Sequence, residues 1–222
     1  MKIEPKLIDQ PIEVDNRLSK LGVDKDLLLD VVSAANAGRN NCTNNHPRSA
    51  PGWMSWSEGN CRLRECLFEK NEGWEWDETD NIPSVLNRKL KIKITVSNTD
   101  FGTGLKHHHP QQMSHKGSAT DRIVFQNQGF FEKLFEKTKN LVPLLQPHHV
   151  ACWYLCVFCE GDIVRAELSC PVRCEDGLFK DFYERIILIG EDGDSTGVRV
   201  RKQEPDGGDS ELDIPVTRKQ AL

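Results

Sequence analysis

Hydrophobic and polar residues alternate most strictly between residues 90 and 97, where the chain reads LKIKITVS. A period of two places the apolar side chains on one face of a β-strand and the polar side chains on the other. We therefore expect a strand with one face in the core. The other face carries Lys91 and Lys93 and is free to meet solvent or a ligand.

The segment from Ala151 to Val172 predicts a β-hairpin, because two stretches rich in aromatic and β-branched residues flank the turn Glu160-Gly161-Asp162. With Gly161 at the centre of the turn, the numbers of paired residues sum to about 322, so that Cys170 faces Cys152. A third strand follows within LFKDFYERIILIG, and GWEWDET predicts a short strand with Trp74 and Trp76 on one face.

Three segments have the pattern of helices. The first begins with Asp24 as its N-cap, buries a stripe that includes Leu28, and ends at Gly38. Ser57 is the expected cap of a second helix. A third, rich in phenylalanine, contains Phe130, Phe131, Leu134, Phe135 and Leu141 and is closed by Pro143.

These elements predict an α+β fold in which a mainly antiparallel sheet packs with about three helices. The sheet is formed by strands near residues 73–98 and by a meander over residues 151–190. Residues 1–22 are expected to be a polar N-terminal arm, residues 23–190 a single domain, and residues 191–222 an acidic, mobile tail with a short strand at GVRVRK.

The composition narrows the location. The chain has 222 residues, 28% of them charged, and no run of the roughly 20 apolar residues that a membrane helix needs. Its first residues lack the apolar centre of a secretory signal. The eight cysteines are too sparse for a disulfide scaffold, and we interpret them as reduced core thiols. We expect a cytoplasmic protein without a membrane partner.

The cysteines and histidines are candidates for metal ligands. A zinc site of Cys156, Cys159, Cys170 and Cys174 is disfavoured, because Cys159 and Cys170 would lie roughly 20 Å apart in the hairpin. The histidine-rich loop offers His107, His109 and His115, which would suit a divalent transition metal. A loop of exposed histidines has the same sequence.

One row of polar residues on the hairpin is the candidate catalytic site. Arg165, Glu167 and Ser169 share a face. If Lys91, Lys93 and Asp100 approach that face, the set resembles the equipment of a metal-dependent nuclease, in which carboxylates hold a divalent metal and a lysine stabilises developing charge. The alternative is a surface ladder of ion pairs among Arg165, Glu167, Glu184 and Arg185.

Charge is distributed unevenly along the chain. Residues 84–140 hold ten basic and four acidic residues, and both flanking regions are acidic. Arg39, Arg48, Arg62 and Arg64 surround the first long loop and are candidates for binding an anion. The first functional hypothesis is therefore a protein that engages nucleic acid or another polyanion, with nuclease-like hydrolysis. The second is a non-enzymatic protein-interaction module that uses the Phe-rich helix and the acidic tail.

Overall fold

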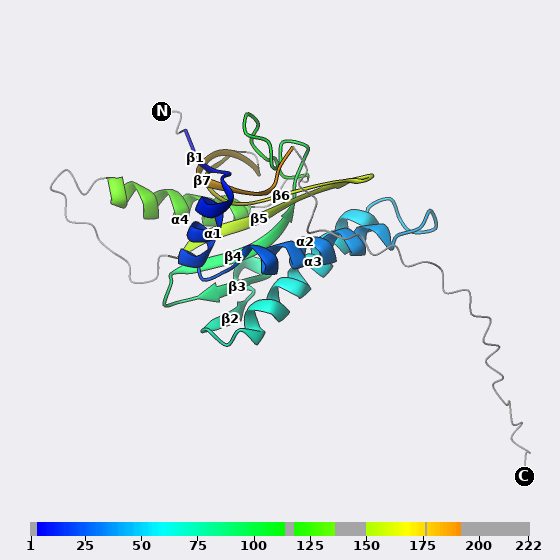
Figure 1. The fold of residues 1–222 in the computed structure, drawn as a ribbon, viewed down its shortest axis with the longest axis horizontal. Coiled ribbons are helices and arrows are strands. Elements are labelled where there is room, and N and C mark those ends of the chain that lie inside the picture. Colours follow the sequence, from blue (N-terminus) through cyan, green and yellow to red (C-terminus); the bar gives the residue numbers. More distant parts are fainter. Residues whose placement is uncertain (1–3, 114–117, 136–149, 176, 192–222) are drawn as a thin grey trace, which may run out of the picture.

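The computed structural model describes residues 4–113, 118–135, 150–175 and 177–191. Four helices lie in these residues: α1 (Pro11–Lys20), α2 (Lys25–Asn40), α3 (Ala50–Glu69) and α4 (Ser118–Phe135). Seven strands accompany them: β1 (Lys6–Ile8), β2 (Trp74–Asp77), β3 (Ser84–Asn87), β4 (Ile92–Asn98), β5 (Ala151–Glu160), β6 (Ile163–Glu175) and β7 (Leu178–Ile189). A short 3₁₀ turn, Thr79–Asn81, joins β2 to β3 (Figure 1).

The strands form one mixed sheet in the order β1-β7-β6-β5-β4-β3-β2. The prediction of a mainly antiparallel sheet is wrong, because β4 pairs with β5 in parallel and β1 pairs with β7 in parallel. The long connection that carries α4 returns the chain to the start of β4, so β5 runs alongside it in the same direction. The other pairs are antiparallel.

The hairpin of β5 and β6 has a different register from the predicted one. Glu160 pairs with Ile163 across the two-residue turn Gly161-Asp162, which shifts the pairing by one position. Because side chains alternate between faces, that shift separates the two cysteines that were expected to face each other. Cys170 belongs to the larger core cluster and Cys152 to the smaller one.

The predicted N-terminal arm contains two elements of the fold. β1 extends the sheet beyond β7, and α1 buries Val14 and Leu18 in the core. Arg17 on the same helix makes an ion pair with the nearly buried Glu184 of β7 at 2.6 Å. Residues 4–22 therefore pack as part of the domain, and α1 is the helix beyond the three that were predicted.

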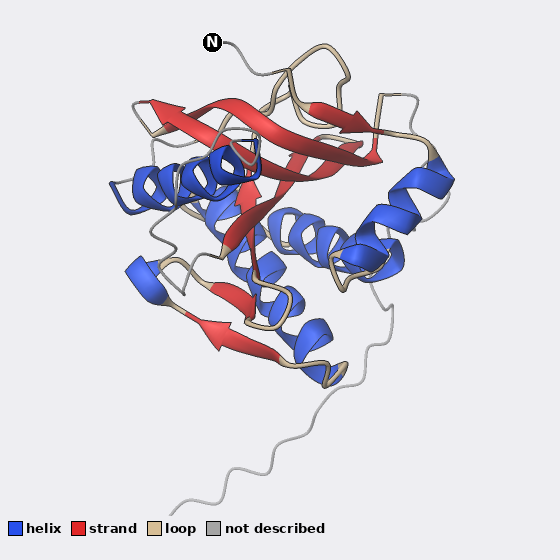
Figure 2. Cartoon of the chain, turned by 90° about the vertical axis from the view of Figure 1, so that its left-hand side faces the viewer, coloured by secondary structure: helices blue, strands red, loops and turns tan. Residues whose placement is uncertain are grey.

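Helices pack on both faces of the sheet, which Figure 2 shows edge-on among them, and each face carries a hydrophobic cluster. Side chains of α1, α2 and α3 form the larger cluster with residues of one sheet face. Ile123 and Val124 of α4 form the smaller cluster with the opposite face. Asn127 fixes α4 there: its Nδ2 donates to the carbonyls of Cys152 and Pro171, both at 2.8 Å, and its Oδ1 accepts from the Cys152 amide at 2.7 Å.

One of the predicted helix ends is confirmed and two are wrong. Asp24 caps α2 as predicted, accepting from the Leu27 amide at 2.9 Å. Gly38 lies inside α2, where a Cβ atom would be 2.7 Å from Cγ of Glu58 on α3, so it permits close helix packing. α3 begins at Ala50 with a proline in its first turn, well before the predicted cap Ser57.

None of the helices in the described ranges is long and apolar enough to cross a membrane. Leu141 and Pro143 of the predicted Phe-rich helix lie outside the described residues, as do residues 192–222 with the predicted GVRVRK strand. The side chains of Phe130, Phe131, Leu134 and Phe135 are also outside the description.

Candidate functional site

The polar row of β6 leads to a buried ion pair. Glu167 and Arg185 are fully buried, and the Arg185 guanidinium contacts both carboxylate oxygens, with Nε 2.8 Å from Oε1 and Nη2 2.5 Å from Oε2. Ser169 Oγ donates to Oε1 of the same carboxylate at 2.5 Å. The sequence placed Glu167 and Arg185 in a surface ladder of ion pairs. The two residues do form an ion pair, but it lies in the interior. Glu184, another member of the predicted ladder, pairs with Arg17.

This ion pair holds the loop that follows β4. The Gly104 amide donates to Glu167 Oε2 at 2.8 Å, and Arg185 Nη2 donates to the Leu105 carbonyl at 3.0 Å. A buried charge pair needs further hydrogen bonds to offset its desolvation, and here loop backbone supplies two of them, while Arg185 Nη1 has no partner. The Glu167 carboxylate is thus occupied by a guanidinium, a hydroxyl and an amide, so it stabilises the loop where a metal-binding carboxylate would need free oxygens.

Lys93 lies on the same sheet face as Glu167 but not beside it. Lys93 is level with Cys152, whereas Glu167 is level with Cys156, and β5 runs between them. Two strand spacings and four residues along the strand separate the two positions by about 16 Å. The Lys93 ammonium makes an ion pair with Asp77 of β2, and Lys91 lies in the exposed turn between β3 and β4.

The other two candidate catalytic residues also have local partners. Asp100 Oδ1 accepts from the amides of Gly102 at 3.1 Å and Gln111 at 2.9 Å, which closes the loop after β4. The Arg165 guanidinium lies over the Phe158 ring, 4.9 Å from its centroid. The structure therefore does not gather Glu167, Lys93 and Asp100 around one reacting position, and their catalytic role stays a prediction.

The predicted metal ligands do not converge in the described part of the chain. His109 packs edge-on against Phe182, with ring centroids 5.4 Å apart, and burial and then the Arg185 charge lower the pKa of His109. His107 is exposed, and His115 lies outside the described residues. Over the described ranges, no group of three or more His, Cys, Asp or Glu side chains is placed to hold a metal ion.

The four arginines predicted to bind an anion are spread over α2, α3 and the loop between them. Arg62 pairs with Asp30 at 2.7 Å and Glu65 at 3.1 Å, and Arg64 pairs with Glu78 at 3.0 Å. Because α3 begins at Ala50, both arginines lie along its middle, far from its N-terminus. Arg48 is exposed in the loop and Arg39 is half-buried near the end of α2.

All eight cysteines are free thiols. Burial raises the pKa of the Cys152 thiol to about 12 and that of Cys159 to about 11. A thiol is reactive as its thiolate, so these side chains are unreactive at neutral pH. The hairpin cysteines thus serve as packing groups.

A different feature stands out on the surface: an aromatic pair at the edge of the sheet. Phe68 at the end of α3 and Trp76 of β2 have ring centroids 5.6 Å apart, yet their exposures are 59% and 64%. β2 pairs with β3 on one side, and no described strand pairs with its other side. We call Phe68, Trp76 and this outer side of β2 the aromatic edge.

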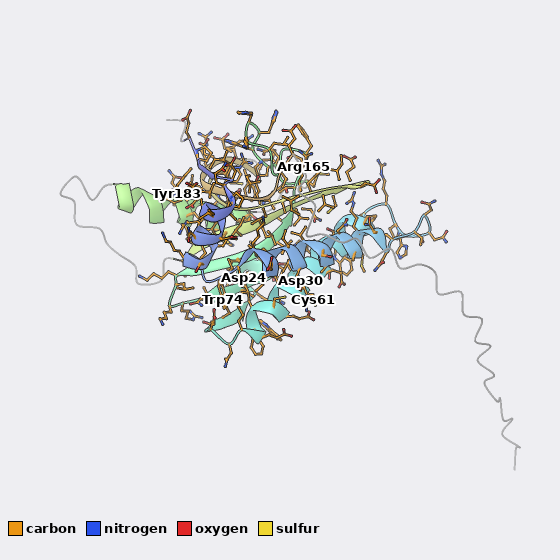
Figure 3. The ribbon with its side chains drawn as sticks, viewed as in Figure 1. Asp24, Asp30, Cys61, Trp74, Arg165 and Tyr183 are labelled. Carbon is orange, nitrogen blue, oxygen red and sulfur yellow. The ribbon has the colours of Figure 1, made fainter. Side chains whose placement is uncertain are left out.

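The sequence contains a signal for this surface. Phe68 directly follows Leu67, which is fully buried, so it falls outside the apolar stripe of α3. Trp76 shares a face with Trp74, as predicted, but only Trp74 reaches the core. Figure 3 shows Trp74 well separated from Arg165, so the aromatic edge and the predicted polar row are different sites.

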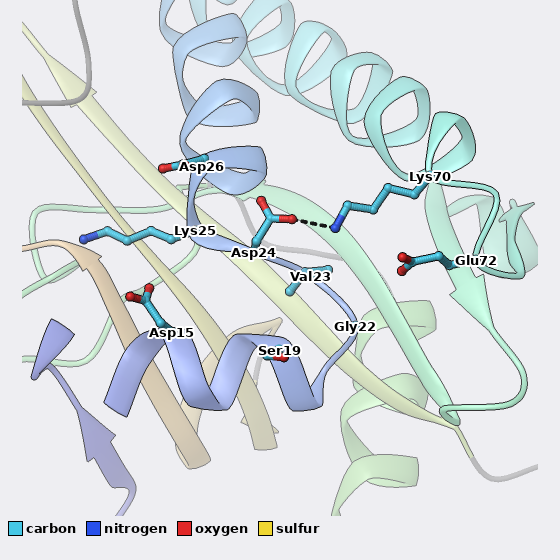
Figure 4. A pocket seen from close by; sticks show the side chains of 9 residues that line it. All are labelled: Asp15, Ser19, Gly22, Val23, Asp24, Lys25, Asp26, Lys70 and Glu72. Atoms are coloured by element: carbon cyan, nitrogen blue, oxygen red, sulfur yellow. Dashed lines mark hydrogen bonds and ion pairs between the residues drawn. The ribbon is translucent and has the colours of Figure 1, made fainter. Parts of the chain in front are cut away.

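An acidic cleft lies next to the start of β2 (Figure 4). Its volume is about 640 Å³, and its charged lining consists of Asp15, Asp24, Asp26, Glu72, Lys25 and Lys70. Lys70 Nζ is 2.5 Å from Asp24, and this ion pair crosses the cleft. Residues 58–80 contain eight acidic and three basic residues, and the β3–β4 turn beside the start of β2 adds Arg88, Lys89 and Lys91, so acidic residues remain the majority around the aromatic edge.

No protein-family model, curated protein or solved structure matches this chain.

Proposed function

We propose that this protein is a non-enzymatic protein-interaction module whose binding surface is the aromatic edge. The observation that carries the proposal is the contact between Phe68 and Trp76, two large rings that remain more than half exposed beside an unpaired strand. Exposed aromatic clusters are a common feature of binding surfaces, where burial of a few such side chains supplies most of the affinity.

The interior polar groups favour this proposal over hydrolysis. Both carboxylate oxygens of Glu167 are occupied by Arg185, Ser169 and the Gly104 amide, although Arg185 Nη1 is buried without a hydrogen-bond partner, and Lys93 pairs with Asp77. A catalytic carboxylate needs access to substrate or to a metal ion. Three of the side chains that the sequence suggested for catalysis, Glu167, Lys93 and Asp100, have structural partners, which supports a non-enzymatic role.

Engagement of nucleic acid stays a prediction. Lys89 and Lys91 are exposed in the turn between β3 and β4, and Arg88 beside them pairs with Glu75 at 2.5 Å. Fluorescence anisotropy with labelled DNA and RNA at low and high salt tests it. Binding that weakens steeply with salt would support this function, whereas no binding at low salt would contradict it.

The second surface to consider is α4, which the sequence suggested as a Phe-rich binding helix. Its Phe125 is 73% exposed and borders a groove of about 330 Å³ with Arg173 and Cys174. We favour the aromatic edge because it combines two contacting rings with an unpaired strand. Phe125 supplies a matched control, since it is a single exposed ring on a different face.

Site-specific photo-crosslinking tests the proposal. A photoreactive residue at Glu69, beside Phe68, is expected to capture a protein that the same residue at Gln126, beside Phe125, does not capture. The purified partner should then bind Phe68→Ser/Trp76→Ser at least about tenfold more weakly than wild type, while Phe125→Ser binds normally. Equal affinity for wild type and the double variant would contradict the proposal. Loss with Phe125→Ser alone would assign the function to α4.

A cytoplasmic location is part of the same proposal. It is supported by the eight free thiols, four of which lie buried in β5 and β6. Reduced cysteines are usual where glutathione and thioredoxin keep thiols reduced. Fractionation of cells that express the tagged full chain tests it, and recovery in a secreted fraction would contradict it.

A further inference from the structure

We infer that the aromatic edge binds an extended segment of a partner protein, in which apolar and basic residues alternate, as an additional strand beside β2. This inference rests on the proposed function and names the chemistry of the partner. It commits to a strand rather than to a helix or a folded face.

The edge of β2 has the properties of an accepting strand. An unpaired edge exposes a row of backbone N–H and C=O groups that an extended peptide satisfies. β2 contains no proline, and its register with β3 is unbroken from Trp74–Asn87 to Asp77–Ser84. A partner strand would therefore pair with the alternate residues of β2 whose N–H and C=O groups point away from β3.

The two faces of β2 define the side chains of an added strand. Trp74 and Trp76 point to the face covered by α3, where Trp76 meets Phe68, whereas Glu75 and Asp77 point to the other face. Side chains of an added strand alternate in the same way. Every second residue of the partner thus packs against the aromatic pair, and the intervening residues face carboxylates.

The charges around the aromatic edge determine whether basic or acidic residues are favoured at those intervening positions of the partner. Acidic residues outnumber basic ones by eight to three between positions 58 and 80, and the cleft beside Glu72 adds Asp15 and Asp26, whereas the β3–β4 turn beside Trp74 adds Arg88, Lys89 and Lys91 and leaves the acidic residues in the majority. Glu75 and Asp77 already pair with Arg88 and Lys93, so attraction arises mainly from the surrounding field and from exposed carboxylates such as Glu69. Such a field attracts a basic segment and repels an acidic one.

The same charges disfavour a second copy of the edge as the occupant. If two β2 strands paired, the acidic surroundings of the two copies, including the exposed Glu69 and Glu72, would repel each other, although Glu75 and Asp77 have ion-pair partners of their own. Acidic residues at an open edge protect against self-pairing while leaving the edge open to a basic strand.

A peptide titration tests the inference. The probe is a fluorescent peptide containing Gly-Val-Arg-Val-Arg-Lys, a sequence that this chain itself contains at residues 197–202 and that has the alternation described. We expect saturable binding below about 1 mM to full-length protein that carries Arg199→Glu/Arg201→Glu, so that its own copy of the segment does not compete, and this binding should weaken between about 0.05 and 0.3 M salt. Exchange should slow on binding at those amides of β2 that point away from β3, because the added strand pairs with them.

Matched variants of the peptide and of the protein separate the contribution of charge to binding from that of strand pairing. Replacing the basic residues of the peptide by Glu, or its second Val by Pro, should each weaken binding at least about tenfold. Glu69→Lys/Glu72→Lys should weaken binding of the basic peptide and strengthen binding of the Glu peptide. Phe68→Ser/Trp76→Ser should abolish both, and Phe125→Ser should change neither.

Each result has one interpretation. No binding of the basic peptide at about 1 mM, or equal binding of the basic, Glu and Pro peptides, overturns the inference. If that happens while the crosslinked partner still depends on Phe68 and Trp76, the proposed function stands and only the partner chemistry is wrong. If the crosslinked partner binds the Phe68→Ser/Trp76→Ser protein normally, the proposed function itself fails.

Discussion

Glu167 is the residue on which the interior of the molecule depends most strongly. Its carboxylate bonds to Arg185, Ser169 and the Gly104 amide, all within the protein. A buried ion pair is a weak source of stability as a whole, but loss of one partner leaves an uncompensated charge. The consequences of changing Glu167 are therefore much larger than those of replacing both partners together.

We expect Glu167→Gln to lower the free energy of unfolding by roughly 3 to 5 kcal/mol, because Arg185 keeps its charge without a carboxylate. Urea denaturation measures this loss, and hydrogen exchange at Gly104 should accelerate. The double variant Glu167→Met/Arg185→Leu should recover part of the loss, because it removes the unpaired charge but leaves the Gly104 amide and the Leu105 carbonyl without these partners. A Glu167→Gln protein as stable as wild type would contradict this account.

Position 104 also requires glycine, because the backbone there comes close to β7. Its φ is +74°, and a Cβ atom would lie 2.4 Å from the Ile189 carbonyl oxygen. Gly161 in the hairpin turn has φ +57° with nothing within 4 Å, so it is a control for backbone strain alone.

Gly161→Ala should therefore cost about 1 to 2 kcal/mol, the usual penalty for a left-handed residue. Gly104→Ala should cost at least about 2 kcal/mol more, because the loop must also move away from β7. Unfolding midpoints of the two variants in urea give the comparison. Equal losses would show that the loop shifts freely.

At the scale of elements, β2 is joined to the sheet by both backbone and side-chain contacts. Asp77 makes an ion pair with Lys93 across β3 and accepts from Ser84 Oγ at 3.1 Å. Partial burial opposes ionisation, but hydrogen bonds from Lys93, Thr79 and Ser84 outweigh it and lower the pKa of Asp77. The ionised form is therefore favoured by folding.

This lowered pKa gives a pH dependence with a definite sign. Stability from Asp77 is present above its unfolded pKa of about 3.9 and is lost as pH falls through its lower folded pKa. Asp77→Asn should cost about 1 to 2 kcal/mol at pH 7, and the difference from wild type should shrink below about pH 4. Urea unfolding across pH measures it, with the exposed Glu160→Gln as control. A difference that is constant with pH would contradict the assignment.

The sequence predicted elements better than their arrangement. Strict alternation located β4 and the turn at Gly161 located the hairpin, because both are local signals. The parallel pairing of β4 with β5 has no local signal, since it depends on where the chain returns after α4. The cysteine pair was misplaced because a shift of one residue in a turn reverses every side chain of a strand.

The candidate site was harder to predict than the elements. Residue types indicated that Glu167 and an arginine would pair, but not that the loop after β4 would bury them. Phe68 falls outside the apolar stripe of its helix, so its exposure was predictable. Its contact with Trp76 was not, because it depends on how the end of α3 lies over β2.

At the scale of the whole molecule, the N-terminal region completes the domain. α1 presents Leu18, which is fully buried, and Ile12, which is 77% exposed, on opposite sides of one helix. Substitutions at these two positions therefore test whether α1 packs in the core or only lies on the surface.

Leu18→Ala should lower the free energy of unfolding by about 2 to 5 kcal/mol, because it leaves a cavity under α1. Ile12→Ala should change it by less than about 0.5 kcal/mol. Chemical denaturation of both variants tests the expectation. If Leu18→Ala were as mild as Ile12→Ala, α1 would contribute little to the domain.

The parallel pairing of β1 with β7 has a consequence for the order of events during synthesis. The contact between Arg17 and Glu184 spans 167 residues. At ribosomal speeds, the first strand therefore waits on the order of 10 s for its partner to emerge. During that interval the apolar side of α1 lacks its final cover, so the nascent chain is more vulnerable to aggregation before β7 is made.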